Sequence, residues 1–409
     1  MDTASAANPH ALDPTRPGFF DSPYAQYREA RENSPVHRTD FGPWMVFGYD
    51  DVVRVLRDQT LSVDDRNAEI SQRSEEFIRE LGDREPRGRK AILNMDPPDH
   101  TRIRRLVQKA FTPRTVDQLA DRVQELVDEA LDAVENTGTM DVIADLAFPL
   151  PFTVISETLG MPDGDTDELR AWSHTLAGTL DPIVDAEAIR AAMEASDLMS
   201  SHVEEVVAWK RRQPADDLLS ALLAAEDDGD VLSPEELREQ VVLLYIAGHE
   251  TTVNLIGNAT FALLRNRSQL RRWHDDPDLG VNAVEELLRY DSPVQFSRRI
   301  ATTEIEVGGV RIPERSFVLT CLGSANHDPA RFGPDAEELR LDRESAPHHV
   351  SFGNGIHHCL GAALARLEGR LALGTLVRRF PDMTLATDTP RWNGRFVLRG
   401  LDALPVALH

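Results

Sequence analysis

Cys359 is the residue of this chain with the clearest capacity for chemistry, because of the segment that surrounds it. The ten residues Phe352–Gly361 read FGNGIHHCLG, and their glycines permit a tight turn before the cysteine. Apolar residues with helical spacing follow from Leu360 onward. Free N–H groups and the dipole at a helix N-terminus favour a thiolate, so we expect a lowered thiol pKa and a side chain able to bind a metal. The alternative is an inert, buried thiol in a tight turn.

A second group of polar residues interrupts an otherwise apolar stretch. Residues 247–252 read AGHETT. Gly248 is expected to let another group approach the backbone closely. Thr251 can donate its hydroxyl to the carbonyl of Ala247, four residues back, and open a local bend in a helix. Glu250 beside it could pass protons, whereas the alternative is a helix–helix contact with a satisfied polar patch.

This polar group lies within the most clearly defined helix that the sequence predicts. Ser233 can cap its start, Pro234 suits the first turn, and Glu236 completes the pattern of a capping box. The helical pattern continues without proline to about Asn266, which gives roughly 33 residues and a length of about 50 Å. Because 241–247 is apolar on all sides, we expect the helix to pass through the interior of the protein.

The remaining patterns predict a mainly α (α+β) fold with small sheets, as one domain over 21–409 after a flexible tail over 1–20. Most of 98–223 has a helical pattern. The charged, poorly periodic region 62–90 is expected to be a loop with short helical pieces. A helix is predicted over 50–56, and short apolar runs predict strands at 44–48, 305–313, 317–322 and 396–399.

The composition disfavours several classes of protein. Lys and Arg number 44 against 69 Asp and Glu, and a net charge of −25 argues against a partner nucleic acid. Neither the first 20 residues nor any later stretch has the apolar run of a signal peptide or membrane anchor, so we expect a cytoplasmic protein that binds no membrane. Cys321 lies in a strand-like apolar run and is expected to be an ordinary core residue, so no disulfide framework is predicted.

Two further pairs of side chains have the spacing of neighbours on a helix. Glu286 and Arg289 are three residues apart and can pair on one helix face. His100 and Arg104 are one turn apart and can face the same anion. Either pattern alone is weak, because such spacing is common on exposed helices.

Taken together and in this order, the motifs resemble the cytochrome P-450 superfamily of haem-thiolate monooxygenases, in particular its soluble, actinobacterial members that oxidise macrolides and other natural products. Ala247–Thr251 is similar to the oxygen-binding helix, and Glu286 with Arg289 to the structural ion pair. The resemblance extends over 44–401 and implies the cytochrome P-450 fold, in which a long central helix lies over the haem. The cysteine-ligand loop is matched by Phe352, Gly355, His357, Cys359 and Gly361.

The resemblance implies haem b as the cofactor, with Cys359 as the proximal thiolate that favours O–O cleavage. It implies that Thr251 and Glu250 deliver protons, and that Ala247 and Gly248 lie against the haem, where Gly248 makes room for dioxygen. Arg343 is expected to join the structural ion pair. The haem propionates would be held by His100, Arg104, Arg299 and His357, with Arg298 as the alternative to Arg299.

Electrons are expected to come from a separate ferredoxin and ferredoxin reductase, because the chain has no flavin or nicotinamide fingerprint. On a helical wheel, Arg102, Arg105 and Lys109 lie on the side opposite His100 and Arg104. In so acidic a protein, we expect these three residues to face solvent and to form a dock for an acidic ferredoxin. The alternative is an ordinary solvated helix face.

The implied reaction is the O₂-dependent hydroxylation or epoxidation of an apolar organic substrate, such as a steroid, terpenoid, fatty acid or macrolide. Two alternatives stay open: a haem peroxygenase that uses hydrogen peroxide directly, and a non-catalytic haem-binding sensor. The pair Glu250–Thr251 argues against the first, because such enzymes generally lack an acid–alcohol pair. The substrate pocket is expected to be lined by Ile92, Leu93, Ala247, Val294 and Val397.

Overall fold

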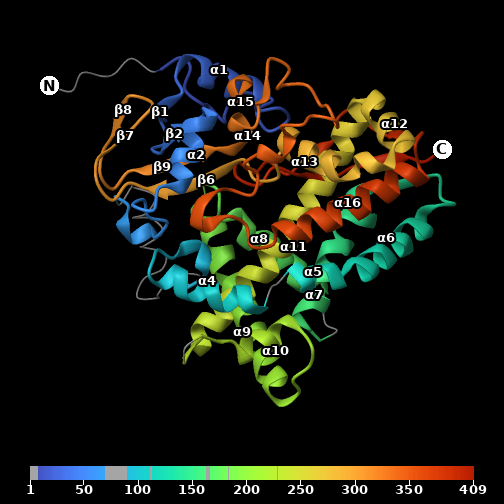
Figure 1. The fold of residues 1–409 in the computed structure, drawn as a ribbon, viewed down its shortest axis with the longest axis horizontal. Coiled ribbons are helices and arrows are strands. Elements are labelled where there is room, and N and C mark those ends of the chain that lie inside the picture. The colour runs from blue at the N-terminus through green and yellow to red at the C-terminus, as the bar shows by residue number, and fades with distance from the viewer. Residues whose placement is uncertain (1–7, 70–89, 111–112, 163–165, 183, 228) are drawn as a thin grey trace.

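Helices make up most of the computed structural model, which describes residues 8–69, 90–110, 113–162, 166–182, 184–227 and 229–409 (Figure 1). Single turns form η1 (Asp65–Asn67), η2 (Ile92–Asn94), η3 (Ile143–Ala147), η4 (Pro277–Leu279), η5 (Ala346–His348) and η6 (Gly355–His357). The α-helices are α1 (Tyr24–Asn33), α2 (Tyr49–Arg57), α4 (Asp99–Ala110), α5 (Pro113–Gln118), α6 (Ala120–Val134), α7 (Pro149–Leu159), α8 (Thr166–Gly178), α9 (Ala186–Arg212), α10 (Leu218–Ala224), α11 (Pro234–Arg265), α12 (Arg267–Asp275), α13 (Gly280–Tyr290), α14 (Leu322–Ala325), α15 (Pro329–Phe332) and α16 (Ala362–Arg379).

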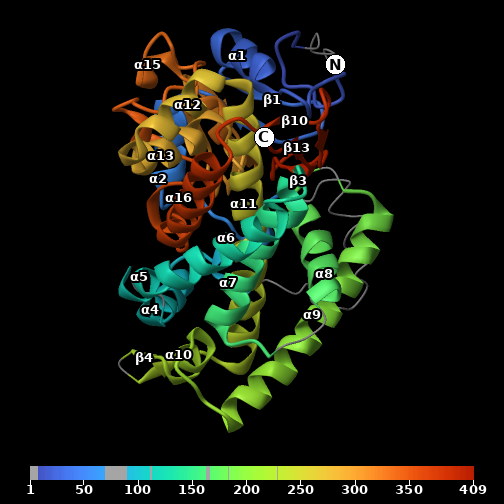
Figure 2. The same ribbon diagram turned by 90° about the vertical axis from the view of Figure 1, so that its right-hand side faces the viewer.

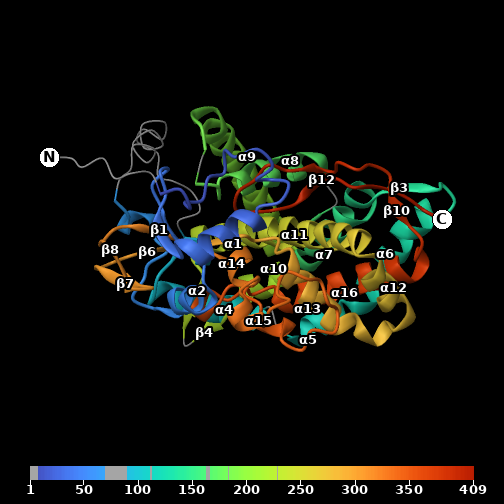
Figure 3. The ribbon, with the colours of Figure 1, turned by 90° about the horizontal axis from the view of Figure 1, so that it is seen from above.

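The long helix α11 lies in the middle of the fold, where α7, α8, α9 and α16 pack against it (Figure 2). Ser233 accepts a hydrogen bond from the Glu236 N–H, and the Glu236 side chain accepts one from the Ser233 N–H, so the predicted capping box is confirmed. Seen from above in Figure 3, α8 and α9 lie on one side of α11, and α12, α13 and α16 lie on the other. The predicted interior helix is therefore confirmed to within one residue at its end.

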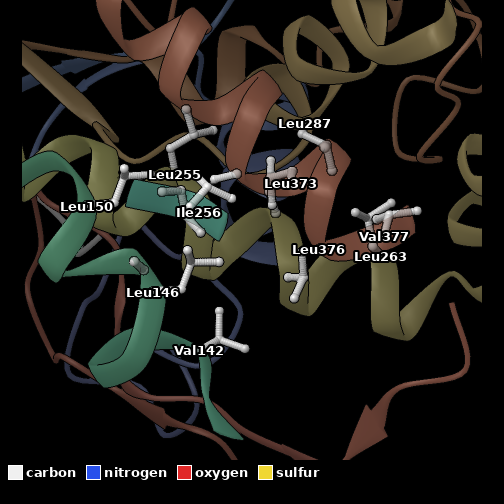
Figure 4. Close-up of a cluster of buried hydrophobic side chains, with 14 of the residues drawn as sticks. Val142, Leu146, Leu150, Leu255, Ile256, Leu263, Leu287, Leu373, Leu376 and Val377 are labelled. Atoms are coloured by element: carbon white, nitrogen blue, oxygen red, sulfur yellow. The ribbon is translucent and has the colours of Figure 1, made fainter. Parts of the chain in front are cut away.

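The largest cluster of buried side chains lies where α11 meets α16 and the segment from η3 to α7 (Figure 4). Leu255 and Ile256 of α11 pack there with Leu373 of α16 and Leu146 of η3. Each of these side chains has at most 2% of its surface exposed. Burying one side chain of this size stabilises the fold by about 1.5–3 kcal/mol, so this cluster fixes α16 against α11.

Small sheets complete the fold. The largest has the strand order β1-β2-β9-β6, in which β2 and β9 are parallel and the other neighbours are antiparallel. Arg299 on β6 lies opposite Val318 on β9 in this register. The strands are β1 (Val36–Arg38), β2 (Trp44–Val46), β3 (Thr139–Asp141), β4 (Glu226–Asp227), β5 (Asp230–Val231), β6 (Phe296–Ile300), β7 (Ile305–Val307), β8 (Val310–Ile312), β9 (Phe317–Cys321), β10 (Thr384–Leu385), β11 (Arg391–Trp392), β12 (Leu401–Ala403) and β13 (Pro405–Ala407).

The mainly α fold with small sheets is confirmed, but two local predictions are wrong. Within the expected flexible tail, Leu12 and Phe19 are buried in a core cluster because their apolar side chains pack beside α1. The segment 396–399 forms only an isolated bridge, at Leu398, in place of a strand. The strand β3 was not predicted. Most of the region 62–90 lies outside the described residues, and no described helix is long and apolar enough to cross a membrane.

Candidate functional site

The loop before α16 places Cys359 at the start of that helix, as the sequence pattern predicts. Gly355 has a φ of +71°, and a Cβ there would lie 2.6 Å from the carbonyl oxygen of Leu56. Only glycine therefore lets the loop lie this close to α2. The Cys359 N–H donates to the carbonyl of Phe352 at 2.9 Å, which closes the loop, and Gly361 is the residue immediately before α16.

The ionisation of Cys359 differs from the expectation. Its side chain is exposed, yet the loss of water to the surrounding protein raises the pKa of the thiol above its ordinary value. The Gly361 N–H, Arg104 and Arg366 lower that pKa by less. The predicted low pKa is therefore wrong for the protein alone, because desolvation outweighs the helix N-terminus. A metal ion deprotonates a coordinating thiol outright, so a bound iron would supply the missing stabilisation.

The helix α4 lies against the cysteine loop and brings two of the predicted residues to it. His100 is 2% exposed, and neither of its ring nitrogens has a hydrogen-bond partner among the described residues. Its ring centre lies 4.2 Å from that of His357. Arg104 donates to the carbonyl of His358 at 2.7 Å. A buried, unpartnered imidazole is unfavourable by itself, so His100 fits a site that a polar group completes.

The neighbouring arginines Arg298 and Arg299 differ in their partners. Arg298 donates to the side chain of Asn94 at 2.6 Å and lies 3.4 Å from the carboxylate of Asp65. Arg299 is 3% exposed and donates only to uncharged oxygens, such as the carbonyl of Leu56 at 3.1 Å. Desolvation lowers the pKa of Arg299 to about 10. A buried cation without a carboxylate partner in the described part of the chain fits an anionic ligand.

The residues around Cys359 thus fit haem b. A thiol can ligate an iron, and a buried histidine and arginine without charged partners among the described residues can bind propionates. His357, between α4 and β6, keeps a pKa of about 3 because of desolvation and of the charges of its neighbours, so its ring is a neutral hydrogen-bonding group at pH 7. The geometry supports the predicted propionate residues and favours Arg299 over Arg298.

The middle of α11 opens at one position. Ala247 is exposed although Tyr245 and His249, two residues away on each side, are buried. The hydroxyl of Thr251 donates to the carbonyl of Ala247 at 3.1 Å, so the predicted hydrogen bond is confirmed. This bond competes for the carbonyl that the helix itself uses, and it orients the hydroxyl along the exposed face.

The structure explains why position 248 is a glycine by its contact with α7. A Cβ at this position would lie 2.8 Å from a side-chain carbon of Ile155 on α7. The close approach that glycine permits is therefore the packing of α7 on α11. The predicted room for dioxygen at Gly248 stays a prediction. The alternative of a helix–helix contact holds for this residue.

Glu250 contacts residues that no sequence motif identifies. Its Oε2 lies 3.4 Å from Arg395, and its Oε1 lies 3.8 Å from His174 on α8. Desolvation raises the pKa of Glu250, while Arg395 and Arg170 lower it. Arg395 comes from an irregular segment near the C-terminus, which carries no motif. The raised pKa favours the protonated form of this carboxyl group, which has a hydrogen to donate.

The residues predicted to line a substrate pocket fall into two groups. Ala247 and Leu93 are exposed and Val294 is partly exposed, so these three are accessible. Ile92 is buried in the cluster that also contains Tyr245 of α11. Val397 is likewise buried, in a segment whose backbone bonds to the one around Val294. Ile92 and Val397 are therefore core residues in this structure, because their apolar side chains complete neighbouring clusters.

The predicted structural ion pair is confirmed. Arg289 Nε lies 2.6 Å from Glu286, and both side chains are fully buried. Arg343 also contacts Glu286, at 3.1 Å, as predicted. Arg289 donates to three backbone carbonyls as well, so its charge is satisfied on every side. This buried network of ion pairs and hydrogen bonds fixes α13 to the chain that leads into the cysteine loop.

The expected ferredoxin dock on α4 is only partly present. Arg102 does not project freely into solvent, because it pairs with Asp230 at 3.2 Å and with Glu236 of α11. Its charge is therefore compensated within the chain, and its inclusion in the dock is corrected. Arg105 and Lys109 are exposed.

Comparisons with known proteins identify the family. A family model described as "Cytochrome P450" matches residues 178–278 and 279–394. The chain is 43% identical over 406 residues to "Cytochrome P450 107B1" of Saccharopolyspora erythraea, covering 95% of this chain and 96% of that protein. It is 39% identical to "6-deoxyerythronolide B hydroxylase" of the same organism, covering 94% and 96%. A structure of myxobacterial CYP267B1 with myristic acid has a TM-score of 0.88 at 39% identity, covering 96% of this chain and 98% of that chain. This chain belongs to the cytochrome P450 family and is a haem b-dependent monooxygenase.

Proposed function

We propose that the protein hydroxylates or epoxidises a mid-sized apolar molecule, with electrons from a separate ferredoxin and ferredoxin reductase. The observation that carries this proposal is the exposure of Ala247 in the middle of a buried helix, directly beside Thr251 and Glu250. An accessible apolar position next to an acid and an alcohol brings a bound substrate to the groups that supply protons.

When bound, haem b supplies the iron at which dioxygen is reduced and its O–O bond is cleaved. The thiolate of Cys359 would hold that iron, and Phe352 and Gly361 shape the loop that presents it. His100, Arg104, Arg299 and His357 would hold the propionates.

On the α11 side, the Thr251 hydroxyl donates its one hydrogen to the carbonyl of Ala247, so its oxygen is free to accept a proton from a neighbouring acid. Glu250 takes a proton from solvent and passes it to Thr251. Desolvation favours the protonated form of Glu250 and Arg395 favours its carboxylate, so that Glu250 can release and regain its proton.

The substrate class is a macrolide-like or fatty-acid-like molecule. The relatives named above include a hydroxylase of 6-deoxyerythronolide B and a protein solved with myristic acid. The accessible residues Leu93, Ala247 and Val294 are all apolar, so a largely apolar substrate fits them. A panel of macrolactones and fatty acids, screened for the shift of the haem Soret band, tests this class. Binding of strongly polar compounds alone would contradict it.

Replacing Thr251 with alanine separates the monooxygenase from a peroxygenase. We expect Thr251→Ala to keep consuming electrons while product falls by about ten- to a hundred-fold, because one positioned proton donor is lost. Thr251→Ser, which keeps a hydroxyl, is the matched control and should retain most of the coupling. Full coupling in Thr251→Ala, or equal turnover with hydrogen peroxide alone, would favour the peroxygenase.

A further inference from the structure

His249 is a fully buried residue that the proposed chemistry leaves without a role. It lies on α11 directly before Glu250, and none of its surface is exposed. The rings of Phe148, Phe152 and Tyr245 surround it, with centres 5.5–6.1 Å from its own. An imidazole that is packed among three aromatic rings keeps one orientation, so the partners of its two ring nitrogens show which nitrogen carries the hydrogen.

The contacts of the ring determine its tautomer. Nδ1 lies 2.8 Å from the carbonyl oxygen of Tyr245, one turn earlier on α11. A carbonyl oxygen can only accept a hydrogen bond, so Nδ1 must carry the hydrogen. Burial lowers the pKa of His249 to about 4, which keeps the ring neutral at pH 7. Nε2 is therefore an unprotonated nitrogen whose lone pair can only accept a hydrogen bond.

The lone pair of Nε2 has no partner among the described residues, and the nearest acid is Glu250. Nε2 is buried and unsatisfied, and it lies 3.9 Å from Glu250 Oε1. That distance exceeds a hydrogen bond, and a small rotation of the Glu250 side chain would close it. An acceptor cannot bond to a carboxylate, because both groups lack a hydrogen. It can bond to the protonated acid, which has one to donate.

We propose that His249 is a positioning residue that stabilises the protonated form of Glu250 by accepting its carboxyl hydrogen at Nε2. Arg395, on the other side of Glu250, stabilises the carboxylate. Glu250 then has one partner for each protonation state, and gaining or losing a proton moves its side chain between them. The proposal rests on the proton-delivery role proposed for Glu250 and gives that role a structural basis.

The other charged groups around this pair favour the carboxylate. Arg170 faces it from α8, and Arg395 faces it from the C-terminal segment. Neither arginine can accept a hydrogen from the acid. The neutral ring of His174 can, at 3.8 Å from Oε1, but its side chain is 58% exposed, so His249 is the buried acceptor of this set. Its removal should therefore lower the pKa of Glu250.

An infrared titration of Glu250 tests the proposal without any substrate. The experiment uses the reduced, carbon monoxide-bound holoenzyme, in which the carboxyl band of Glu250 is identified by its absence in Glu250→Gln. We expect His249→Phe, which keeps a ring and removes the acceptor, to lower the titration midpoint by about half to one pH unit, the shift that one neutral hydrogen bond produces. Phe152→Leu perturbs the same group of aromatic rings, keeps the acceptor and should leave the midpoint unchanged.

Nitrogen NMR of ¹⁵N-histidine-labelled holoenzyme gives a second readout, because it reports the tautomer of His249 directly. A signal of an Nδ1–H, Nε2-unprotonated ring supports the proposal. An Nε2–H tautomer, an unchanged midpoint in His249→Phe, or an equal shift in Phe152→Leu would overturn it. If Glu250→Gln retains full coupling of electrons to product, the proton-delivery role itself fails, and that result is separate from the infrared and NMR outcomes.

Discussion

The replacement of Arg299 by methionine should affect the protein in opposite ways with and without haem. In the haem-free protein, a pKa lowered from 12.5 to about 10 corresponds to a cost of about 3 kcal/mol for holding the buried charge, at 1.36 kcal/mol per pH unit. Methionine removes that cost. It also removes hydrogen bonds to Leu56, Arg298 and Ser297, worth about 1 kcal/mol each. These two effects offset each other, so we expect nearly unchanged stability of the haem-free protein.

With haem bound, the same replacement removes a charge-assisted hydrogen bond to a propionate. Such a bond contributes about 1.5–3 kcal/mol, so we expect haem affinity to fall by about ten- to a hundred-fold. Denaturant unfolding of the haem-free protein measures the first quantity, and transfer of haem to a competing apoprotein measures the second. Arg298→Met is the matched control, because Arg298 already has Asp65 and Asn94 as partners, and it should change haem affinity less than three-fold.

Two results would refute this reasoning. Unchanged haem affinity in Arg299→Met would mean that the uncompensated charge does not serve a propionate. A loss of several kcal/mol in the haem-free protein would mean that Arg299 is a structural cation whose hydrogen bonds outweigh its desolvation.

Three further predictions concern the core, acid stability and the exposed face of α11. Glu286→Gln should destabilise the fold by about 3–5 kcal/mol, seen in denaturant unfolding, because it leaves the buried charge of Arg289 without its carboxylate; a loss below 1 kcal/mol would contradict this. Hydrogen bonding to His349 and Arg366 outweighs desolvation and lowers the pKa of Glu285 to about 2. The ionised side chain therefore contributes at most about 3 kcal/mol to the free energy of unfolding above pH 4.5, and this contribution is lost as the pH falls toward 2. Glu285→Gln should make the free energy of unfolding depend less on pH between 4.5 and 2. Ala247→Leu should weaken substrate-induced spectral shifts at least ten-fold, measured per bound haem, whereas unchanged shifts would place the substrate elsewhere.

The sequence predicts the parts of this protein that local patterns determine. The helix α11 has a capping box at one end and no proline after its first residue, so its bounds follow from short-range rules. The pair of Glu286 and Arg289 follows from helical spacing, and the position of Cys359 follows from the glycines before it. In each case the determining residues are within a few positions of one another.

The predictions that fail depend on contacts between distant segments. The segment 396–399 has the composition of a strand, but it bonds to Asp181 and to the chain around Val294 without joining a sheet. Arg102 finds Asp230 and Glu236, more than 100 residues away, which no helical wheel reveals.

The pKa of the Cys359 thiol also depends on contacts between distant segments. Its predicted low pKa considers the helix N-terminus alone, whereas the assembled fold adds a larger desolvation.

The spectrum of the reduced protein with carbon monoxide tests the central claim most directly, since it reports the ligand on the opposite side of the iron. The two cysteines provide the comparison. Wild-type protein and Cys321→Ala, which alters a buried core thiol, should both show the long-wavelength Soret band of a thiolate-ligated haem. Cys359→Ala should lose that band. A thiolate band that survives in Cys359→Ala, or that is absent from the wild-type protein, would contradict the assignment of Cys359 as the haem ligand.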